Sequence, residues 1–169
     1  SSFEHLVNML YAMGNGNPEN GWNYVERLCA NLDGKLLSGS SAVNKGVADG
    51  EYAVGLTHEE LGIKYILLGS PVKVIYMKEG VITKPDGVYI IKGAKNLENA
   101  KKFIDYCVSL DAQNILVNKA NRRAIRTDAD SSEVVIPMTE IYSITDNPDI
   151  VESNRQKWLD KFRDIFTGI

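Results

Sequence analysis

Patterns typical of helices alternate along this chain with short apolar runs typical of buried strands. The apolar runs span Tyr52 to Leu56, Val72 to Tyr76 and Val88 to Ile91, and a shorter strand is expected at Lys35 to Leu37. Glycine and proline clusters separate these runs from the helical segments. Because alternating helices and strands pack as a sheet covered by helices, the sequence predicts an α/β layered fold with a mostly parallel sheet.

The expected helices carry an apolar residue at every third or fourth position. Most begin at a serine, threonine or asparagine, which accepts hydrogen bonds from the first helical turn. Helices are expected from Ser1 to about Met13, from Trp22 to Asp33, from Ser40 or Ser41 to Asp49, from Thr57 or His58 to about Leu68, from Asn96 to Cys107, from Asp111 or Ala112 to about Val117, and from Asn147 to Phe166.

The composition bounds the class of protein. With 169 residues, of which 44% are hydrophobic, the chain is long enough for one domain with a sizeable core. Its 19 basic and 22 acidic residues are interspersed and the net charge is only −3, so we expect no nucleic-acid partner. No apolar run approaches the length of a membrane-spanning helix. Ser1 already lies at a helix start, so we expect the chain to be a fragment of a longer protein.

The two cysteines, Cys29 and Cys107, each lie in a helical pattern and lack the CxxC spacing of a metal or redox site. They form a single disulfide if the protein is exported and the two helices meet. Otherwise each is a small buried apolar residue. The sequence leaves both alternatives open.

Hydroxyl side chains precede two of the expected helices, at Ser1 and Ser2 and again from Ser38 to Ser41. A helix start combines unpaired backbone N–H groups with the positive end of the helix dipole, so hydroxyls there are suited to holding an anion. Serine is also a favoured N-cap residue, and capping alone also explains the pattern.

The cluster Thr57-His58-Glu59-Glu60 follows the apolar run that ends at Leu56. It contains metal-ligand residue types, but adjacent helical residues point about 100° apart, so both carboxylates do not easily join His58 around one ion. Acidic residues are also favoured at a helix start by its dipole. We therefore expect no metal here. The cluster is either a capped, solvated helix start or a ligand contact through Thr57 or His58.

Motifs of enzymes and of nucleotide-binding proteins are absent from the sequence. It contains no GxSxG nucleophile turn, no GxxxxGK[ST] phosphate loop and no GxGxxG turn. We therefore expect a protein that is not an enzyme and that uses no cofactor. Arg122, Arg123 and Arg126 are either a fork for a phosphate or members of surface ion pairs.

Three runs of sequence together resemble one known family. They are SAVNKGVADGEYAVGL from Ser41 to Leu56, GSPVKVIY from Gly69 to Tyr76 with Glu79-Gly80 after it, and PDGVYIIKGAKN from Pro85 to Asn96 followed by NAKKFID and Gln113. They are similar, in this order, to the extracellular or periplasmic solute-binding proteins of ABC importers, family 1, type II. The resemblance is closest to the branch that contains ferric-ion, phosphonate and sugar-phosphate binders.

Members of that family fold as two lobes joined by crossing strands. The resemblance implies that this chain is a three-layer α/β/α lobe of the periplasmic-binding-protein type II fold, with the first lobe missing. Residues 1–71 would form the α/β core of the second lobe, and residues 72–112 a hinge strand and a segment that packs on the first lobe. Residues 113–169 would be helical segments that return to the second lobe.

The resemblance also implies a function. The chain would belong to the substrate-binding component of an ABC importer, which captures a small anionic solute, a phosphorylated sugar or a phosphonate, and docks on a membrane permease. The location implied is extracellular or periplasmic, with a lipoprotein anchor on the full-length form as one option. The ligand contacts implied are Ser1, Ser2, Ser40, Ser41, Thr57 and His58.

Two alternatives stay open. A ferric-iron-binding importer component is disfavoured, because iron binders of this family carry two adjacent tyrosines where this chain has Glu60-Leu61. The other alternative is a truncated lobe that acts only as an oligomerising interaction module. A segment that lacks its partner lobe favours a homodimer or an exchange of segments between two copies.

Overall fold

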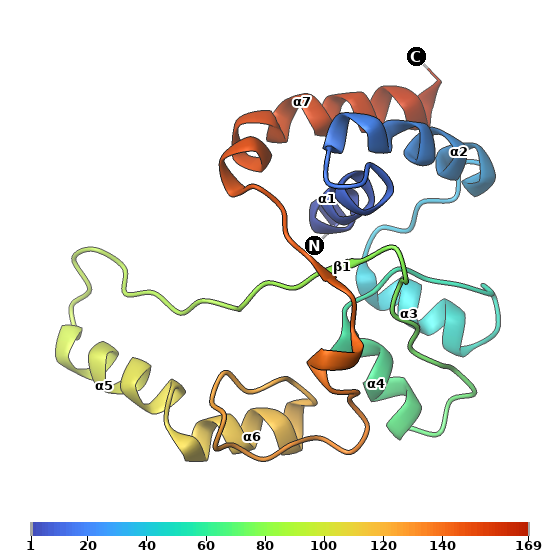
Figure 1. The fold of residues 1–169 in the computed structure, drawn as a ribbon. Helices are drawn as coiled ribbons and strands as arrows, with labels where there is room; N and C mark the ends of the chain where they lie inside the picture. The colour runs from blue at the N-terminus through green and yellow to red at the C-terminus, as the bar shows by residue number, and fades with distance from the viewer. Residues whose placement is uncertain (1, 169) are drawn as a thin grey trace. The chain divides into compact units, whose positions relative to one another are not determined.

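In the computed structural model the chain divides into two compact units (Figure 1). Unit 1 consists of Ser1–Leu56, Ile75–Thr83 and Met138–Ile169, and unit 2 of Thr57–Val74 and Lys84–Pro137. The structure describes residues 2–168. Each unit is therefore assembled from segments that lie far apart in the sequence.

The expected helices are all found, with ends shifted by a few residues. Unit 1 contains α1 (Ser2–Met13), the 3-10 helix η1 (Pro18–Gly21), α2 (Trp22–Leu32), α3 (Ser40–Ala48), β1 (Val81–Ile82), the 3-10 helix η2 (Met138–Glu140), β2 (Ser143–Ile144) and α7 (Pro148–Thr167). Unit 2 contains α4 (Glu59–Leu67), α5 (Leu97–Cys107) and α6 (Leu110–Ala120).

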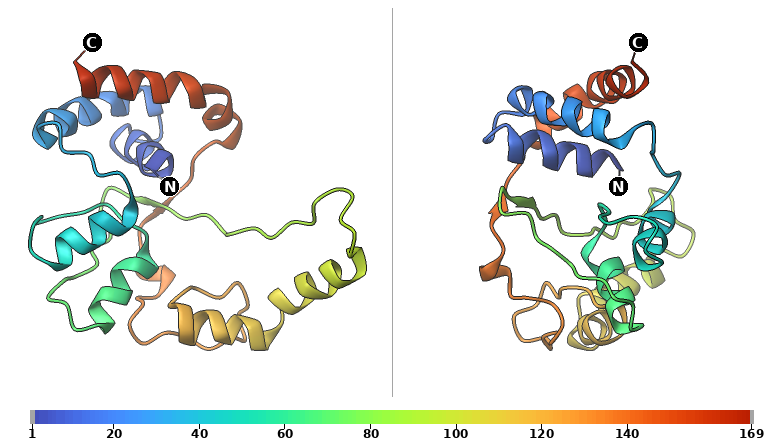
Figure 2. Two further views of the ribbon diagram at one scale, coloured as in Figure 1. Left: turned by 180° about the vertical axis from the view of Figure 1, so that it is seen from behind. Right: turned by 90° about the vertical axis from the view of Figure 1, so that its right-hand side faces the viewer.

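Helices α1, α2 and α7 share the apolar core of unit 1 (Figure 2). The side chains of Val7, Leu10, Val25 and Trp158 are fully buried. Burying an apolar side chain of this kind stabilises a fold by about 1.5–3 kcal/mol. Gly21 allows η1 to lie directly against α1, because a Cβ atom there would be 2.4 Å from the Leu10 carbonyl oxygen.

An asparagine followed by proline begins α7, as the sequence predicts. The Asn147 side chain accepts hydrogen bonds from the backbone N–H groups of Asp149 (3.1 Å) and Ile150 (3.2 Å), and Pro148 fills the first helical position. The apolar residues of α7, including the buried Trp158, then face the core. None of the helices in the described part of the chain is long and apolar enough to cross a membrane.

Strands β1 and β2 form a short parallel pair, with Val81 opposite Ser143. On the other edge of β1 lies Asn8, a buried residue of α1. Its amide donates to the Gly80 carbonyl oxygen (3.2 Å) and accepts from the Ile82 N–H (2.6 Å). The Asn8 side chain therefore makes hydrogen bonds of the kind that a further strand would make.

The strands expected from the longer apolar runs are wrong. Among the described residues, Lys35 to Leu37, Tyr52 to Leu56, Val72 to Tyr76 and Val88 to Ile91 have no ladder partner, and the sheet has two strands. Several of their side chains are exposed, Val54 by 80%, Ile75 by 78% and Ile91 by 83%. An apolar run shows which residues favour burial, but a strand forms only where a neighbour completes its backbone hydrogen bonds.

Unit 2 is joined by the buried side chain of Gln113 on α6. Its amide donates to the Cys107 carbonyl oxygen at the end of α5 (2.8 Å), and its oxygen accepts from the Ile125 N–H (2.9 Å). Ile63 of α4 and Val117 of α6 supply buried apolar side chains. Helix α5, by contrast, has no buried residue.

The two cysteines are free thiols that lie in different units. Cys29 is buried on α2 in unit 1, and burial raises the pKa of its thiol. Cys107 is half-buried at the end of α5 in unit 2. The disulfide alternative is therefore contradicted, and Cys29 acts as a small buried apolar residue.

We expect Asn8→Ala to lower the free energy of unfolding of unit 1 by about 2–4 kcal/mol, because it leaves the Gly80 carbonyl and the Ile82 N–H without their partner. Trp22 and Trp158, the chain's two tryptophans, are both buried in unit 1, so their fluorescence during urea unfolding reports on that unit. Asn154→Ala, which removes a solvent-exposed hydrogen bond on α7, is the control and should cost less than about 0.5 kcal/mol. Equal losses in the two variants would contradict the role of Asn8.

Candidate functional site

The Thr57-His58-Glu59-Glu60 cluster leads into helix α4 of unit 2. His58 is the N-cap residue, with an extended backbone (φ −81°, ψ 146°), and its side chain makes no capping hydrogen bond. Thr57 Oγ1 is buried and has no hydrogen-bond partner among the described residues. A buried hydroxyl without a partner costs free energy, so Thr57 has a hydrogen-bonding capacity that the fold itself does not use.

Glu59 and Arg123 form a two-point ion pair at this helix start. Arg123 donates to both carboxylate oxygens, from Nε at 2.9 Å and from Nη2 at 2.7 Å. The same Nη2 donates to the Ile136 carbonyl oxygen at 2.8 Å. The Arg123 and Glu59 side chains are only 27% and 22% exposed, so solvent screens this pair less than an ordinary surface salt bridge.

The neighbouring residues repeat this pairing at a more exposed position. Arg122 pairs with Glu60 (3.1 Å) and also with Asp86. Both carboxylates of the cluster are thus engaged by guanidinium groups. In residues 2–168 no group of three or more metal-ligating side chains that could hold an ion is found.

Arg126 lies apart from that pairing and binds Asp128 through two hydrogen bonds (2.8 and 2.7 Å). The hydrogen bonds from the guanidinium hold the pKa of the Asp128 carboxyl below its ordinary value. The three arginines are therefore members of ion pairs, which is the second of the two interpretations that the sequence left open.

The predicted serine contacts belong to unit 1. Helix α1 begins at Ser2, which is exposed, and Ser1 lies outside the described residues. Helix α3 begins at Ser40, and both Ser40 and Ser41 are exposed in its first turn. The expectation that one of them caps α3 is wrong, because the N-cap residue is Gly39, which has no side chain with which to cap.

The starts of α3 and α4 differ from that of α6, where the Ser109 hydroxyl accepts from the Ala112 N–H (3.3 Å). No side chain caps α3 or α4, so their first N–H groups keep the capacity to bind a ligand, and the helix dipole favours an anion. Helices α2 and α5 also begin without such a bond, so a missing cap alone does not mark a site. At α3 and α4 it coincides with exposed serines and with the unpaired Thr57 hydroxyl.

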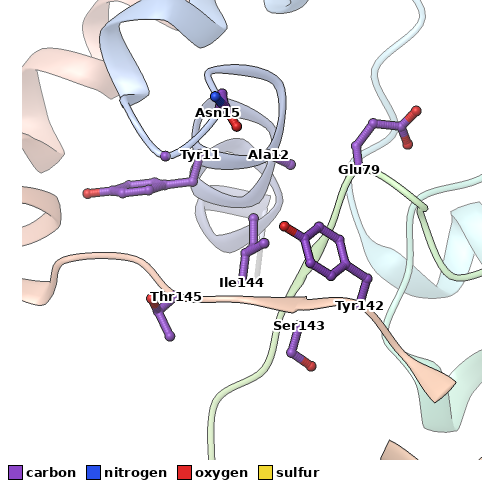
Figure 3. Close-up of a pocket in the computed structure, with 9 residues that line it drawn as sticks. Tyr11, Ala12, Asn15, Glu79, Tyr142, Ser143, Ile144 and Thr145 are labelled. Atoms are coloured by element: carbon purple, nitrogen blue, oxygen red, sulfur yellow. The ribbon is translucent and has the colours of Figure 1, made fainter. Parts of the chain in front are cut away.

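A cavity of about 350 Å³ lies in unit 1 between the C-terminal end of α1 and strand β2 (Figure 3). Its lining residues include four that carry hydroxyl groups, Tyr11, Tyr142, Ser143 and Thr145, and one that carries a carboxylate, Glu79. A carboxylate beside the carbonyl end of a helix disfavours an anion. None of the predicted contacts within residues 2–168 lines this cavity, so it is separate from the candidate site.

The structure thus brings Thr57 and His58 together at one helix start, and whether they contact a ligand stays a prediction. The sequence did not predict which residues pair with the Glu59 and Glu60 carboxylates. Arg122 and Arg123 lie 62 and 64 positions further along the chain, and no local pattern reports so distant a contact.

A family model of bacterial extracellular solute-binding proteins matches residues 9–141. The chain belongs to this family. The family expected from the three sequence runs is thereby confirmed, and the match covers all of them.

Two proteins show how far the similarity of this solute-binding chain extends. An uncharacterized protein of Haemophilus influenzae (strain ATCC 51907 / DSM 11121 / KW20 / Rd) is 26% identical over 113 residues, which are 66% of this chain and 32% of that protein. The periplasmic binding protein AfuA from Actinobacillus pleuropneumoniae, solved with exogenous fructose-6-phosphate bound, matches 99% of this chain with a TM-score of 0.83 and 23% identity. That likeness confirms the periplasmic-binding-protein fold. The chain spans 52% of the AfuA chain, about half its length.

We expect Thr57→Val to leave the stability of unit 2 unchanged or slightly higher, because the hydroxyl that it removes is buried and unpaired. Thermal unfolding followed by circular dichroism measures this. Ser109→Ala is the comparison, since it removes the cap of α6 and should cost about 1 kcal/mol. A loss in Thr57→Val as large as that in Ser109→Ala would show that the hydroxyl has a structural role.

Proposed function

We propose that this chain is part of the substrate-binding component of an ABC importer, which captures a small anionic solute, and that the start of α3 in unit 1 and the start of α4 in unit 2 each offer groups that suit an anion. Binding would be non-covalent and would need neither a catalytic group nor a cofactor. Family membership supports a role in solute binding. The loaded protein would dock on a membrane permease outside the cytoplasm, at an extracellular or periplasmic location, whether free or held by a lipoprotein anchor.

The observation that carries this proposal is the unused hydrogen-bonding capacity at these two helix starts. Thr57 Oγ1 is buried without a partner at α4, and Ser40 and Ser41 are exposed at α3 behind a glycine N-cap. A fold gains stability by pairing such groups within itself. Groups left unpaired at the positive end of a helix dipole suit an anionic ligand.

A phosphorylated sugar or a phosphonate is the solute class that we favour. The phosphate group offers several acceptor oxygens to N–H and hydroxyl donors and carries the charge that a helix start stabilises. The similar protein AfuA was solved with fructose-6-phosphate bound, which is the same class of compound. Ferric iron is disfavoured as the solute, because Glu60 is already paired with Arg122 at the position where an iron binder has a tyrosine.

Capture would occur between two lobes, with the ligand stabilising the closed form. This chain would supply one wall of that cleft. The ligand contacts that we propose are Ser2, Ser40 and Ser41 in unit 1 and Thr57 and His58 in unit 2. We also propose that Ser1, outside the described residues, contributes beside Ser2. Because one wall makes only part of the contacts, we expect the chain alone to bind weakly, at about millimolar affinity.

An NMR titration of the 15N-labelled chain with fructose 6-phosphate tests this proposal. We expect saturable shifts of the amide signals in the first turns of α3 and α4, and none with uncharged fructose at the same concentrations. The paired change Ser40→Ala and Ser41→Ala should weaken binding several-fold. Ser153→Ala, which changes an exposed hydroxyl on α7, is the matched control and should bind like the wild type.

Shifts confined to other parts of the chain would contradict the proposed site. Equal shifts with fructose and fructose 6-phosphate would contradict the anionic solute. Tight binding by this chain alone would contradict the idea that it supplies only one wall of the cleft.

An interaction module is the second candidate, and the surface of α5 favours it. The helix has no buried residue, and Phe103 (61% exposed) and Tyr106 (49%) leave apolar rings open to solvent. The preceding segment exposes Tyr89 (87%) and Ile91 (83%). Exposed apolar side chains in this number are typical of a surface that a partner covers, such as another lobe or a second copy.

Light scattering distinguishes the two candidates. A monomer that binds fructose 6-phosphate supports the importer component. A dimer with no affinity for it supports the interaction module, and Phe103→Glu should then shift the dimer to monomer by placing a charge in the apolar surface. Glu98→Gln, on the same helix and exposed, is the control for a change of charge alone.

A further inference from the structure

Asn15 and Gly16 form the centre of the turn that follows α1. Both have a left-handed backbone (φ 52° and 85°), and the Asn17 N–H donates to the Gly14 carbonyl oxygen across the turn (3.1 Å). Positive φ at both central residues is the mark of a type I′ turn, which favours Asn-Gly because these two residues tolerate that conformation. Asn15 and Gly16 are both exposed to solvent.

The side-chain amide of an asparagine that precedes glycine is open to attack by the backbone. The nitrogen of the glycine bonds to Cγ of the asparagine, the bond from Cγ to the side-chain nitrogen breaks, and ammonia leaves with the proton that the backbone nitrogen gives up. Water then opens the cyclic succinimide at either of its carbonyl carbons. The product is an aspartate or an isoaspartate, in which the main chain runs through the side-chain carbon. Glycine favours the first step because no Cβ shields its nitrogen and its backbone turns freely.

The chain contains two Asn-Gly pairs, and the fold restrains the second one far more than the first. Asn20 lies in the 3-10 helix η1, and Gly21 is buried. A Cβ atom on Gly21 would be 2.4 Å from the Leu10 carbonyl oxygen, so the backbone there lies against α1 and has little room to turn toward the Asn20 side chain. A Cβ atom on Gly16, by contrast, would meet nothing within 4 Å.

A hydrogen bond from the Gly16 N–H to the Tyr11 carbonyl oxygen (2.9 Å) is what restrains the first pair. The reaction needs that nitrogen free, so the turn must open before it reacts. An exposed turn opens at a small cost in free energy, whereas release of Gly21 requires η1 to part from α1 and to expose the buried Pro18. The structure therefore favours reaction at Asn15 over Asn20, although the two dipeptides are chemically the same.

We propose that Asn15 is a site of spontaneous deamidation in the folded protein and that Asn20 is protected. The product adds a second carboxylate to the residues that line the cavity between α1 and β2, which already include Glu79 (Figure 3). The isoaspartate form also lengthens the main chain within the turn, so the type I′ geometry is lost. This inference goes beyond the proposed function and is independent of it, because none of the proposed anion contacts within residues 2–168 lines the cavity.

Mass spectrometry of the wild-type chain after incubation in warm, mildly alkaline buffer tests the proposal. Cleavage after glutamate separates the two pairs, since Asn15 falls in the peptide His5–Glu19 and Asn20 in the peptide Asn20–Glu26. We expect deamidation of the first peptide to be at least about tenfold faster than that of the second. In urea no fold distinguishes the pairs, so their rates should agree within about twofold.

Two variants assign the reaction and its route. Asn15→Gln should abolish the fast reaction of the first peptide, because glutamine closes a larger ring more slowly, and this peptide still contains Asn8 and Asn17 as internal controls. Asn15→Asp supplies the aspartate product as a chromatographic standard. The wild-type chain should yield this product and a second one, the isoaspartate, of the same mass.

Equal rates at the two pairs in the folded chain, or a faster reaction at Asn20, would overturn the proposal. So would an Asn15 that stays intact in the folded chain over a period in which it reacts in urea. Aspartate as the sole product would contradict the succinimide route. Circular dichroism verifies that the chain stays folded during the incubation.

Discussion

The amide of Asn8 is the contact on which unit 1 depends. That unit is built from three separate segments of chain, and Asn8 joins two of them by holding Gly80 and Ile82 on the free edge of β1. The other edge of β1 pairs with β2 and so holds the third segment, which the Tyr11 hydroxyl also binds by accepting from the Asn147 N–H (3.2 Å). Asn8 thus connects α1 directly to the β1 segment, and through β1 to the β2 segment. Because these groups are sheltered from water, leaving them unpaired would cost more than their bonds contribute.

Unit 2 also joins separate segments of the chain, in this case by ion pairs in addition to the Gln113 side chain. Its early segment carries Glu59 and Glu60, and its late segment carries Arg122 and Arg123, so two adjacent ion pairs join parts of the chain that are remote in sequence. Ion pairs of intermediate exposure contribute less to stability than buried amide pairs, because solvent and salt screen them. They have another consequence, since they decide the net charge at the start of α4. The ion pairs that help to assemble this unit therefore also set the charge at its candidate site.

Side-chain caps are found at α6 and α7, whereas α3 and α4, which we propose serve a ligand, have none, as is also true of α2 and α5. Asn147 and Ser109 accept hydrogen bonds from the first turns of α7 and α6, which stabilises helices that pack within their units. Helices α3 and α4 forgo this contribution of about 1 kcal/mol each. In a solute-binding protein, a ligand that accepts hydrogen bonds from the first N–H groups would take the place of the missing side-chain cap. A helix-start N–H group that is paired within the fold cannot also bind a ligand. The Thr57 hydroxyl is likewise not paired within the fold.

The sequence by itself determined the helices and the family. Apolar spacing and residues such as Asn147-Pro148 act within a few positions, so they could be read locally, and three ordered runs carried the family resemblance. It did not determine the strands, because Val54 and Ile75 favour burial in any fold, whereas a strand needs a hydrogen-bonded neighbour supplied from elsewhere in the chain. Only the tertiary structure showed that Asn8 pairs with Gly80 and Ile82, which lie 72 and 74 positions away. The same holds for Glu59 and Arg123, which lie 64 positions apart. Contacts at that separation depend on how the whole chain packs, and the start of α4 takes its charge from one of them.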